Sequence, residues 1–285
     1  MTVPVRSLRR EAAARLRAAG VGSPEYDADE LLSHVLGLPR TRLPLVDDVT
    51  DAQAEAFVGL LDRRAAREPL QHLTGIAAFR HVELVVGPGV FVPRPETELL
   101  AGWAVDRARE LVAQGRTPVV VDLCTGSGAV ARAVADEVPE ARVYAVELDP
   151  AAHAWAERNL AGTGVDLRLG DMADAFPDLE GEVDVVTCNP PYIPLEAWES
   201  VAPEARDHDP ELALFSGPDG LDAFRVLERR AAALLRVGAV LGAEHADVQG
   251  ESAPAVFAAA GRWREVVDHA DLAGRARFVT ARLAR

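Results

Sequence analysis

Apolar residues in the first 75 positions recur at the three- and four-residue spacing of amphipathic helices. The series consist of Leu8, Ala12, Leu16 and Ala19, then Leu31, Leu32, Val35 and Leu36, then Phe57, Leu60 and Leu61. Pro24 and Pro39 separate the series, because proline does not continue a helix interior. The pattern predicts a small helical domain over residues 1–75.

The pattern changes at residues 76–94. Val82, Leu84 and Val86 alternate as in a half-buried strand, and Gly87-Pro88-Gly89 follows as a turn before the extended run Val90-Phe91-Val92. We expect a β-hairpin that links two domains.

From Pro95 onward, short apolar runs alternate with helical patterns. Val119–Leu123 is a continuous apolar run, typical of a strand buried on both faces. Further strands are expected at 142–147, 165–169, 183–188, 239–244, 264–268 and 277–281, with helices at 127–138, 150–160, 221–235 and 253–260. The alternation predicts an α/β domain over residues 95–285, a doubly wound, Rossmann-like parallel sheet closed by an antiparallel C-terminal hairpin.

Composition restricts the class of protein. Two cysteines, Cys124 and Cys188, are too few for a disulfide scaffold and fit a reducing compartment. No apolar run approaches the length of about 18 residues that a membrane span needs, and the arginine-rich start lacks the apolar segment of a targeting peptide. The histidines show no metal-site spacing, so we expect no metal. The lack of a membrane span and of a targeting segment predicts a cytoplasmic protein without membrane contact. We also expect a monomer.

Residues 81–285 carry the entire net charge of −15, since arginines and acidic residues balance in residues 1–80. Such a domain repels phosphate backbones, so stable nucleic-acid binding is not expected. The charge suits a basic partner.

Three strand ends carry residues suited to a nucleoside ligand. Cys124-Thr125-Gly126-Ser127-Gly128 forms a glycine-bearing turn between a strand and a helix, where a missing Cβ admits a ligand. Glu147 ends the next strand and can accept hydrogen bonds from both ribose hydroxyls. Asp171 and Met172 follow the third strand, placed to bond an adenine amino group and cover its ring.

This turn has two other interpretations. It could merely pack a helix on a strand, or it could belong to an NAD enzyme. The turn lacks the third glycine of the dinucleotide fingerprint, and no second mononucleotide half is evident, which disfavours NAD.

The strand at 183–188 runs into Asn189-Pro190-Pro191-Tyr192. Methyl transfer to an amide requires that two acceptors hold the two hydrogens of a weakly nucleophilic nitrogen. The side-chain oxygen of Asn189 and the carbonyl of Pro190 supply them, the prolines fix the carbonyl direction, and Tyr192 stacks on the amide plane. The alternative is that the two prolines only terminate a strand.

These residues resemble the class I methyltransferases that act on planar exocyclic nitrogens. Val92-Pro93-Arg94-Pro95-Glu96-Thr97-Glu98 further resembles the hallmark of the HemK/PrmC family, the release factor glutamine methyltransferases. Supporting segments lie at 30–37, 68–75, 217–221 and 271–275. Two positions depart from the family, which usually has glycine at Cys124 and often an aromatic residue at Met172.

The resemblance implies a helical N-terminal domain that helps dock a translation release factor. It also implies that S-adenosylmethionine binds at Cys124–Gly128, Glu147 and Met172, and that Asn189 touches both ligands. The expected product is a release factor methylated on the glutamine of its Gly-Gly-Gln loop.

Several residues permit more than one interpretation. Arg94 can begin a helix with its neighbours or contact the cofactor, and the two cysteines are expected close together as packing residues, with oxidation sensitivity as the minor alternative. His208-Asp209-Pro210 is interpreted as a turn rather than an acid–base pair. Trp198 either anchors its loop or packs on the partner.

Three rival functions remain. An adenine amino-methyltransferase acting on DNA or RNA needs the same acceptors, but it must also grip phosphates, which the acidic charge opposes. A methyltransferase of a ribosomal-protein glutamine is disfavoured by the intact Pro-Arg-Pro-Glu-Thr-Glu stretch, by resemblance only. A non-catalytic factor-binding protein would be expected to have lost Asn189 or Gly126, and both are present.

Overall fold

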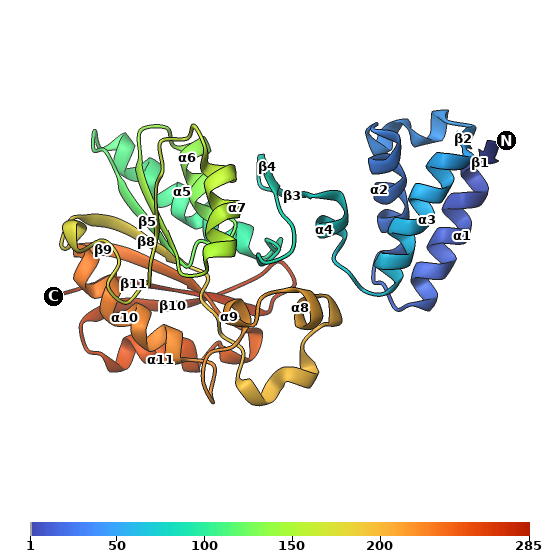
Figure 1. Cartoon of the computed structure of the whole chain (residues 1–285). Helices are drawn as coiled ribbons and strands as arrows, with labels where there is room; N and C mark the ends of the chain where they lie inside the picture. The colour runs from blue at the N-terminus through green and yellow to red at the C-terminus, as the bar shows by residue number, and fades with distance from the viewer. Residues whose placement is uncertain (1) are drawn as a thin grey trace. The chain divides into compact units, whose positions relative to one another are not determined.

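In the computed structural model, which describes residues 2–285, the chain divides into two compact units (Figure 1). Unit 1 comprises Met1–Ile76, Val86–Pro88 and Ala202–His208. Unit 2 comprises Ala77–Val85, Gly89–Val201 and Asp209–Arg285. No helix in the described part of the chain is long and apolar enough to cross a membrane.

Unit 1 is a small helical bundle, as predicted. Its N-terminal elements are β1 (Thr2–Pro4), α1 (Val5–Ala18), α2 (Pro24–Leu36), η1 (Arg40–Leu45), β2 (Asp48–Thr50), α3 (Asp51–Ala65) and α4 (Leu70–Thr74). The apolar series of the sequence meet in one core, where Leu16, Leu31 and Phe57 are fully buried. The short antiparallel pair β1–β2 was not predicted, because three-residue strands leave no periodic pattern.

A late segment of the chain also belongs to unit 1. Helix α8 (Pro203–His208) brings Glu204 against Arg64 and Arg67, with nitrogen–oxygen distances of 3.0 and 2.6 Å. Arg64 also pairs with Asp27 at 2.7 Å, and both side chains are 7% exposed. We call Asp27, Arg64, Arg67 and Glu204 the Arg64 cluster. Sequence position alone places α8 in the predicted α/β domain over residues 95–285, so local patterns could not assign it to unit 1.

Unit 2 contains a seven-stranded sheet of order β10-β11-β9-β8-β5-β6-β7. Its strands are β5 (Val119–Leu123), β6 (Arg142–Glu147), β7 (Asp166–Leu169), β8 (Val183–Cys188), β9 (Leu235–Glu244), β10 (Trp263–Ala270) and β11 (Ala276–Leu283). Strands β5 to β9 are parallel, and β11 and β10 are antiparallel additions. The predicted doubly wound sheet with a C-terminal hairpin is confirmed.

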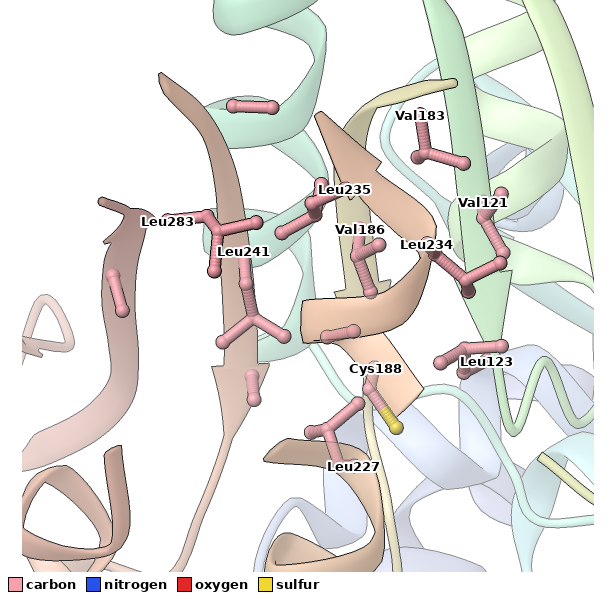
Figure 2. Close-up of a cluster of buried hydrophobic side chains, with 14 of the residues drawn as sticks. Val121, Leu123, Val183, Val186, Cys188, Leu227, Leu234, Leu235, Leu241 and Leu283 are labelled. Carbon is pink, nitrogen blue, oxygen red and sulfur yellow. The ribbon is translucent and has the colours of Figure 1, made fainter. Parts of the chain in front are cut away.

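Helices cover both faces of this sheet (Figure 1). They are α5 (Thr97–Ala113), α6 (Ala129–Glu137), α7 (Pro150–Leu160), α10 (Asp222–Leu234) and α11 (Ser252–Ala259). Successive β5 residues point to opposite faces, so Val121 and Leu123 pack with α10 residues such as Leu227 and Leu234, as Figure 2 shows, while Val120 packs with residues of α5 and α6. Burial on both faces explains why β5 is apolar throughout.

A hairpin is present in residues 76–94, but it is not the predicted one: the predicted strand at 82–86 is its second strand, and the predicted turn at 87–89 and partner strand at 90–92 are wrong. The strands are β3 (Ile76–Phe79) and β4 (Val82–Val85), joined at Arg80-His81, and residues 90–92 form no strand. Pro93 and Pro95 follow directly and have no backbone N–H to offer a strand ladder. Val90 and Val92 are buried instead as core side chains.

Short elements complete unit 2 after β7. They are η2 (Pro177–Leu179), η3 (Leu195–Ser200), α9 (Glu211–Leu214) and η4 (Asp247–Gln249). Two of them, η3 and α9, lie in the loop that follows Tyr192, and η4 follows β9 directly.

Candidate functional site

The carboxyl ends of the parallel strands form one row at one edge of the sheet. Leu123 of β5 is in register with Val146 of β6 and with Cys188 of β8, and Cys188 is in register with Ala243 of β9. After β5 the sheet grows on one side through β6 and β7, and then on the other side of β5 through β8 and β9. The gap between β5 and β8 is therefore the topological switch point, where open α/β sheets bind ligands. The two segments singled out in the sequence, 124–128 and 189–192, therefore both begin at this point.

The turn after β5 contains three residues in the left-handed backbone region, which leaves part of the turn open to a ligand. Cys124, Gly126 and Gly128 all have positive φ, of 59°, 58° and 83°. A Cβ added at Gly126 would meet nothing within 4 Å, so open space borders the turn at this residue. At Gly128 a Cβ would lie 3.1 Å from Leu160 Cγ, so that glycine makes room for helix packing. The space available to a ligand therefore lies beside Gly126.

Asp122 holds this turn from inside the sheet, a role that the sequence did not reveal. Its carboxylate accepts hydrogen bonds from the Thr125 hydroxyl at 2.6 Å and from the Thr187 hydroxyl at 2.8 Å. Burial raises its pKa to about 6, against the lowering effect of these two hydrogen bonds. An acid inside a strand predicted to be buried on both faces was the available signal, because a buried carboxylate needs such partners.

Glu147 lies at the end of β6, facing the same turn. Its carboxylate accepts the Gly126 N–H at 2.7 Å and the Asp149 N–H at 2.9 Å, one on each oxygen. Each oxygen keeps a further lone pair, so the fixed carboxylate can still accept two hydroxyl groups. Burial raises the pKa of Glu147, and the backbone hydrogen bonds oppose that rise. These residues fit a ribose with two free hydroxyls.

The substitution Glu147→Gln tests this assignment. We expect it to weaken binding of S-adenosylhomocysteine, the form that the expected methyl donor S-adenosylmethionine takes after transfer, by about 10- to 100-fold, because a hydrogen bond to a charged acceptor contributes about 1.5–3 kcal/mol. Isothermal titration calorimetry measures the change. Glu157→Gln on the exposed side of α7 is the matched control and should bind as wild type does. Equal affinity in both variants would remove Glu147 from the ribose site.

Met172 and Asp171 follow β7 at the same edge. The Met172 sulfur lies 3.5 Å from the Cys124 sulfur, which brings the predicted adenine neighbour against the turn. The Asp171 side chain is exposed and accepts the Ala173 N–H at 2.8 Å. The structure thus groups all three predicted cofactor segments along the ends of β5, β6 and β7.

The two cysteines are close together, as expected. Cys188 is fully buried, and burial together with the neighbouring Cys124 raises the pKa of its thiol well above the usual value. Cys188 packs in the core cluster of Figure 2. Both are free thiols. Among residues 2–285 there is no group of three or more histidine, cysteine or acidic side chains that could hold a metal ion.

Asn189-Pro190-Pro191-Tyr192 leaves β8 directly after Cys188. The Asn189 amide nitrogen lies 3.4 Å from the Thr97 hydroxyl oxygen, and the Tyr192 hydroxyl donates to Glu244 at 3.2 Å. Burial and the Glu244 charge raise the pKa of Tyr192, so its phenol keeps its proton. The sequence predicted no role for Glu244, and none for Thr97 beyond its place in the 92–98 segment, because their contacts join segments far apart in the chain.

The backbone after the motif is held by a second pair of contacts. Gln249 of η4 donates its side-chain N–H to the Tyr192 carbonyl at 2.9 Å. A Cβ added at Gly220 would lie 2.2 Å from the same carbonyl oxygen, and Gly220 has a φ of 75°. The Gly217–Leu221 segment is thus a close support for the motif.

Gly220→Ala should therefore disturb the Tyr192 loop. We expect kcat to fall by about 10²-fold because a shift of about 1 Å in a reacting group has an effect of that size. Steady-state methyl transfer measures it. The control is Gly274→Ala, which also has positive φ but whose added Cβ meets nothing within 4 Å. If both variants lose activity equally, the close approach at Gly220 is not the reason.

The loop after Tyr192 is anchored at two further points of unit 2. Asp209 forms an ion pair with Arg94 at 2.6 Å and its side chain is fully buried, which raises its pKa to about 6. The Arg94 guanidinium also lies 4.8 Å from the centre of the Phe91 ring. Trp198 stacks on Phe215 with ring centres 5.3 Å apart.

These contacts revise one interpretation and bear on two others. His208-Asp209-Pro210 is not a simple turn, because His208 ends α8 and Asp209 is a buried ion-pair partner. Trp198 anchors the loop, although 39% of it remains exposed. Arg94 stands just before α5 and binds Asp209.

Comparison with known proteins provides independent evidence on the family of this chain. A family model described as the PrmC N-terminal domain matches residues 7–75, and one described as a methyltransferase domain matches residues 120–208. A release factor glutamine methyltransferase of Streptomyces coelicolor is 57% identical, with 96% of each chain covered. One of Mycolicibacterium smegmatis is 48% identical, with 99% of each covered. A 4-amino-L-phenylalanine/4-methylamino-L-phenylalanine methyltransferase of Streptomyces pristinaespiralis is 50% identical over 70% of this chain and 69% of its own.

Among solved structures, the hMettl16 catalytic domain in complex with the MAT2A 3'UTR hairpin 6 is similar in fold. It has a TM-score of 0.54 at 14% identity, with 70% of this chain and 75% of that chain covered. Identity this low supports the shared fold alone.

Proposed function

Because the chain belongs to the release factor glutamine methyltransferase family, we propose that it methylates translation release factors. The target is the side-chain amide nitrogen of the glutamine in their Gly-Gly-Gln loop, and the methyl donor is S-adenosylmethionine. The observation that carries the proposal is that Asn189-Pro190-Pro191-Tyr192 and the Cys124–Gly128 turn follow the ends of two adjacent parallel strands, β8 and β5, at the switch point of the sheet.

The cofactor contributes an electrophilic methyl group on a sulfonium sulfur. In the proposed site the turn Cys124-Thr125-Gly126-Ser127-Gly128 holds its amino-acid part, with open space beside Gly126. Glu147 accepts the ribose hydroxyls, and Asp171 and Met172 bind the adenine amino group and ring. Asp122 keeps the turn in place through Thr125.

The substrate amide is held by the catalytic motif. The Asn189 side-chain oxygen accepts one amide hydrogen and the Pro190 carbonyl accepts the other, which directs the nitrogen lone pair toward the methyl group. Tyr192, fixed by its hydrogen bond to Glu244, supplies the aromatic face, and Pro191 restricts the backbone. Transfer would form the N–CH3 bond as the S–CH3 bond breaks, with the bonding electrons remaining on sulfur as the thioether of S-adenosylhomocysteine. The methylated nitrogen would be cationic and acidic enough to lose its proton without a strong base.

The proposed partner is a release factor that binds both unit 1 and unit 2. The enzyme is proposed to be a cytoplasmic monomer without stable nucleic-acid binding. Three observations support this. Residues 7–75 match the PrmC N-terminal domain, the two cysteines are free thiols, and residues 81–285 carry the net charge of −15.

The relative that acts on 4-amino-L-phenylalanine supplies a second candidate substrate class. The lone pair of an arylamine nitrogen is conjugated, as that of an amide nitrogen is, and the nitrogen carries two hydrogens that the same acceptors can bind. The release factor enzyme is 57% identical over 96% of this chain, whereas the arylamine enzyme is 50% identical over 70% of it. The higher identity and the higher coverage both favour the protein substrate.

Incubation with labelled S-adenosylmethionine tests the proposal. Separate reactions contain purified release factor, ribosomal proteins, adenine-containing DNA or RNA, and 4-amino-L-phenylalanine, and mass mapping locates the label. We expect label on the glutamine of the Gly-Gly-Gln loop and none above background elsewhere. Label found only on bases, on a ribosomal protein or on the arylamine would refute the proposal.

A further inference from the structure

We infer that Asn159 is a positioning residue through which the β3–β4 hairpin holds the Cys124–Gly128 turn in the shape that binds the cofactor. The inference rests on the proposed function in one respect, because that proposal gives the turn its ligand, S-adenosylmethionine. Its physical basis is a set of three hydrogen bonds that join one buried side chain to two backbone segments.

Asn159 lies near the end of α7 and is 5% exposed. Its side-chain oxygen accepts the Val85 N–H at 2.8 Å, and its NH2 group donates to the Val85 carbonyl at 3.0 Å. The NH2 group also donates to the Ser127 carbonyl at 2.9 Å. One side chain therefore connects the last residue of β4 with the turn that follows β5.

The backbone groups determine which end of the Asn159 amide is oxygen and which is nitrogen. The Val85 N–H can only donate, so it requires the side-chain oxygen. The Val85 and Ser127 carbonyls can only accept, so they require the NH2 group. A flipped amide would lose all three hydrogen bonds, which makes the contact specific to asparagine in this orientation.

The Ser127 carbonyl lies outside the helical hydrogen bonds of α6. Gly128 is the N-cap of α6, and its carbonyl accepts the first helical N–H, that of Arg132, at 2.8 Å. Ser127 precedes this N-cap and is 3% exposed, so water has little access to it. A buried carbonyl needs a hydrogen-bond partner, and Asn159 supplies one.

Leu160, the next residue of α7, packs on the same turn. A Cβ added at Gly128 would lie 3.1 Å from Leu160 Cγ. The end of α7 thus supports Ser127 by a hydrogen bond and Gly128 by packing. None of these contacts involves the 189–192 motif, so we expect the loss of Asn159 to change cofactor binding and not the transfer step.

Asn159→Ala removes the three hydrogen bonds together. We expect it to weaken S-adenosylhomocysteine binding by about 3- to 10-fold, the effect of losing one neutral hydrogen bond that preorganises a site. The kcat for release factor methylation at saturating S-adenosylmethionine should stay within about twofold of wild type. Isothermal titration calorimetry and steady-state kinetics measure the two quantities.

Asn159→Asp separates the hydrogen bonds from the space that the side chain fills. Aspartate has nearly the shape of asparagine, but its carboxylate only accepts, so it presents oxygen to the Val85 and Ser127 carbonyls. It should weaken S-adenosylhomocysteine binding at least as much as Asn159→Ala does. Wild-type affinity in either variant would overturn the inference.

Asp184→Ala is the matched control for a general loss of stability. Asp184 is 4% exposed and accepts the Val119 N–H at 3.0 Å, at the end of β5 opposite to the turn. Its loss should lower the melting temperature without changing S-adenosylhomocysteine affinity. If Asp184→Ala and Asn159→Ala lost affinity equally, destabilisation alone would be the cause and the inference would fail.

The hairpin supplies a measurement that does not depend on activity. If Asn159 connects the turn to β4, a ligand bound at the turn also stabilises the pair formed by Asn159 and Val85, because linkage is reciprocal. We expect S-adenosylhomocysteine to slow hydrogen exchange of the Val85 N–H by about 3- to 10-fold in wild type and not in Asn159→Ala, as measured by NMR. The same effect in both proteins, or none in either, would contradict the connection.

The outcomes separate the inference from the proposed function. If wild type binds S-adenosylhomocysteine but transfers no methyl group to release factor, the proposed function fails, and the titrations of the Asn159 variants still decide the inference. If wild type methylates release factor and Asn159→Ala keeps wild-type affinity, the inference is refuted and the function stands. A kcat lowered by more than about tenfold in Asn159→Ala would place Asn159 in the transfer step and refute the positioning role.

Discussion

Asn189→Ala is expected to reduce kcat for release factor methylation by about 10²- to 10³-fold while cofactor affinity stays within about tenfold of wild type. The side-chain oxygen of Asn189 is one of two acceptors for the substrate amide, and its hydrogen bond strengthens as positive charge develops on the nitrogen. An alanine at this position leaves one amide hydrogen without a fixed acceptor. Single-turnover methyl transfer and titration with S-adenosylhomocysteine measure the two quantities separately.

The cofactor titration is also the control for this variant. Asn189 lies beside the Cys124–Gly128 turn along the sheet edge, so a collapsed site would lower cofactor affinity as well as rate. A loss of rate with affinity preserved assigns Asn189 to the reaction itself. Unchanged kcat would remove it from the catalytic role.

The sheet that positions Asn189 was predictable because its central strands are buried on both faces. Such strands show as apolar runs without alternation, and Val119–Leu123 and Val183–Cys188 are the clearest of them. The chemistry was predictable for a related reason. Parallel strands end at one edge, so Gly126, Glu147 and Asn189 come together whenever the strand order is that of a doubly wound sheet.

The supporting residues were not predictable, because each depends on a contact between distant segments. Thr97 meets Asn189 across 92 positions, and Arg94 meets Asp209 across 115. Local patterns describe periodicity within one element and contain no information on such pairs. The same limit explains the misplaced strand at 90–92, where alternating Val90 and Val92 gave a strand pattern although Pro93 and Pro95 prevent strand pairing.

Helix α8 shows the same limit in unit 1. Its six residues have no strong pattern, yet Glu204 contributes to a cluster with Arg64 and Arg67 across 140 and 137 positions. Burial opposes ionisation of Glu204, but hydrogen bonds from Arg67, from its own backbone and from Arg64 outweigh it and lower its pKa to about 2. The carboxylate is therefore charged at neutral pH and needs its cations.

Arg64→Met is expected to lower the free energy of unfolding of unit 1 by about 3–5 kcal/mol, because the substitution leaves the buried Asp27 carboxylate without its cation and leaves Glu204 with Arg67 alone. Hydrogen exchange of peptides from α2, α3 and α8 measures the local effect. The matched control is Arg63→Met on the same helix. Arg63 is 53% exposed and pairs with Glu68, so its loss should cost at most about 1 kcal/mol.

A further variant separates lost charge from lost packing. Combining Arg64→Met with Asp27→Asn and Glu204→Gln removes the unpaired charges and should recover most of the protection against exchange, since neutral amides cost less to bury than carboxylates. If protection stays low in the triple variant, the aliphatic contacts of Arg64 hold unit 1 together and its charge does not. If Arg64→Met and Arg63→Met behave alike, the cluster makes no special contribution.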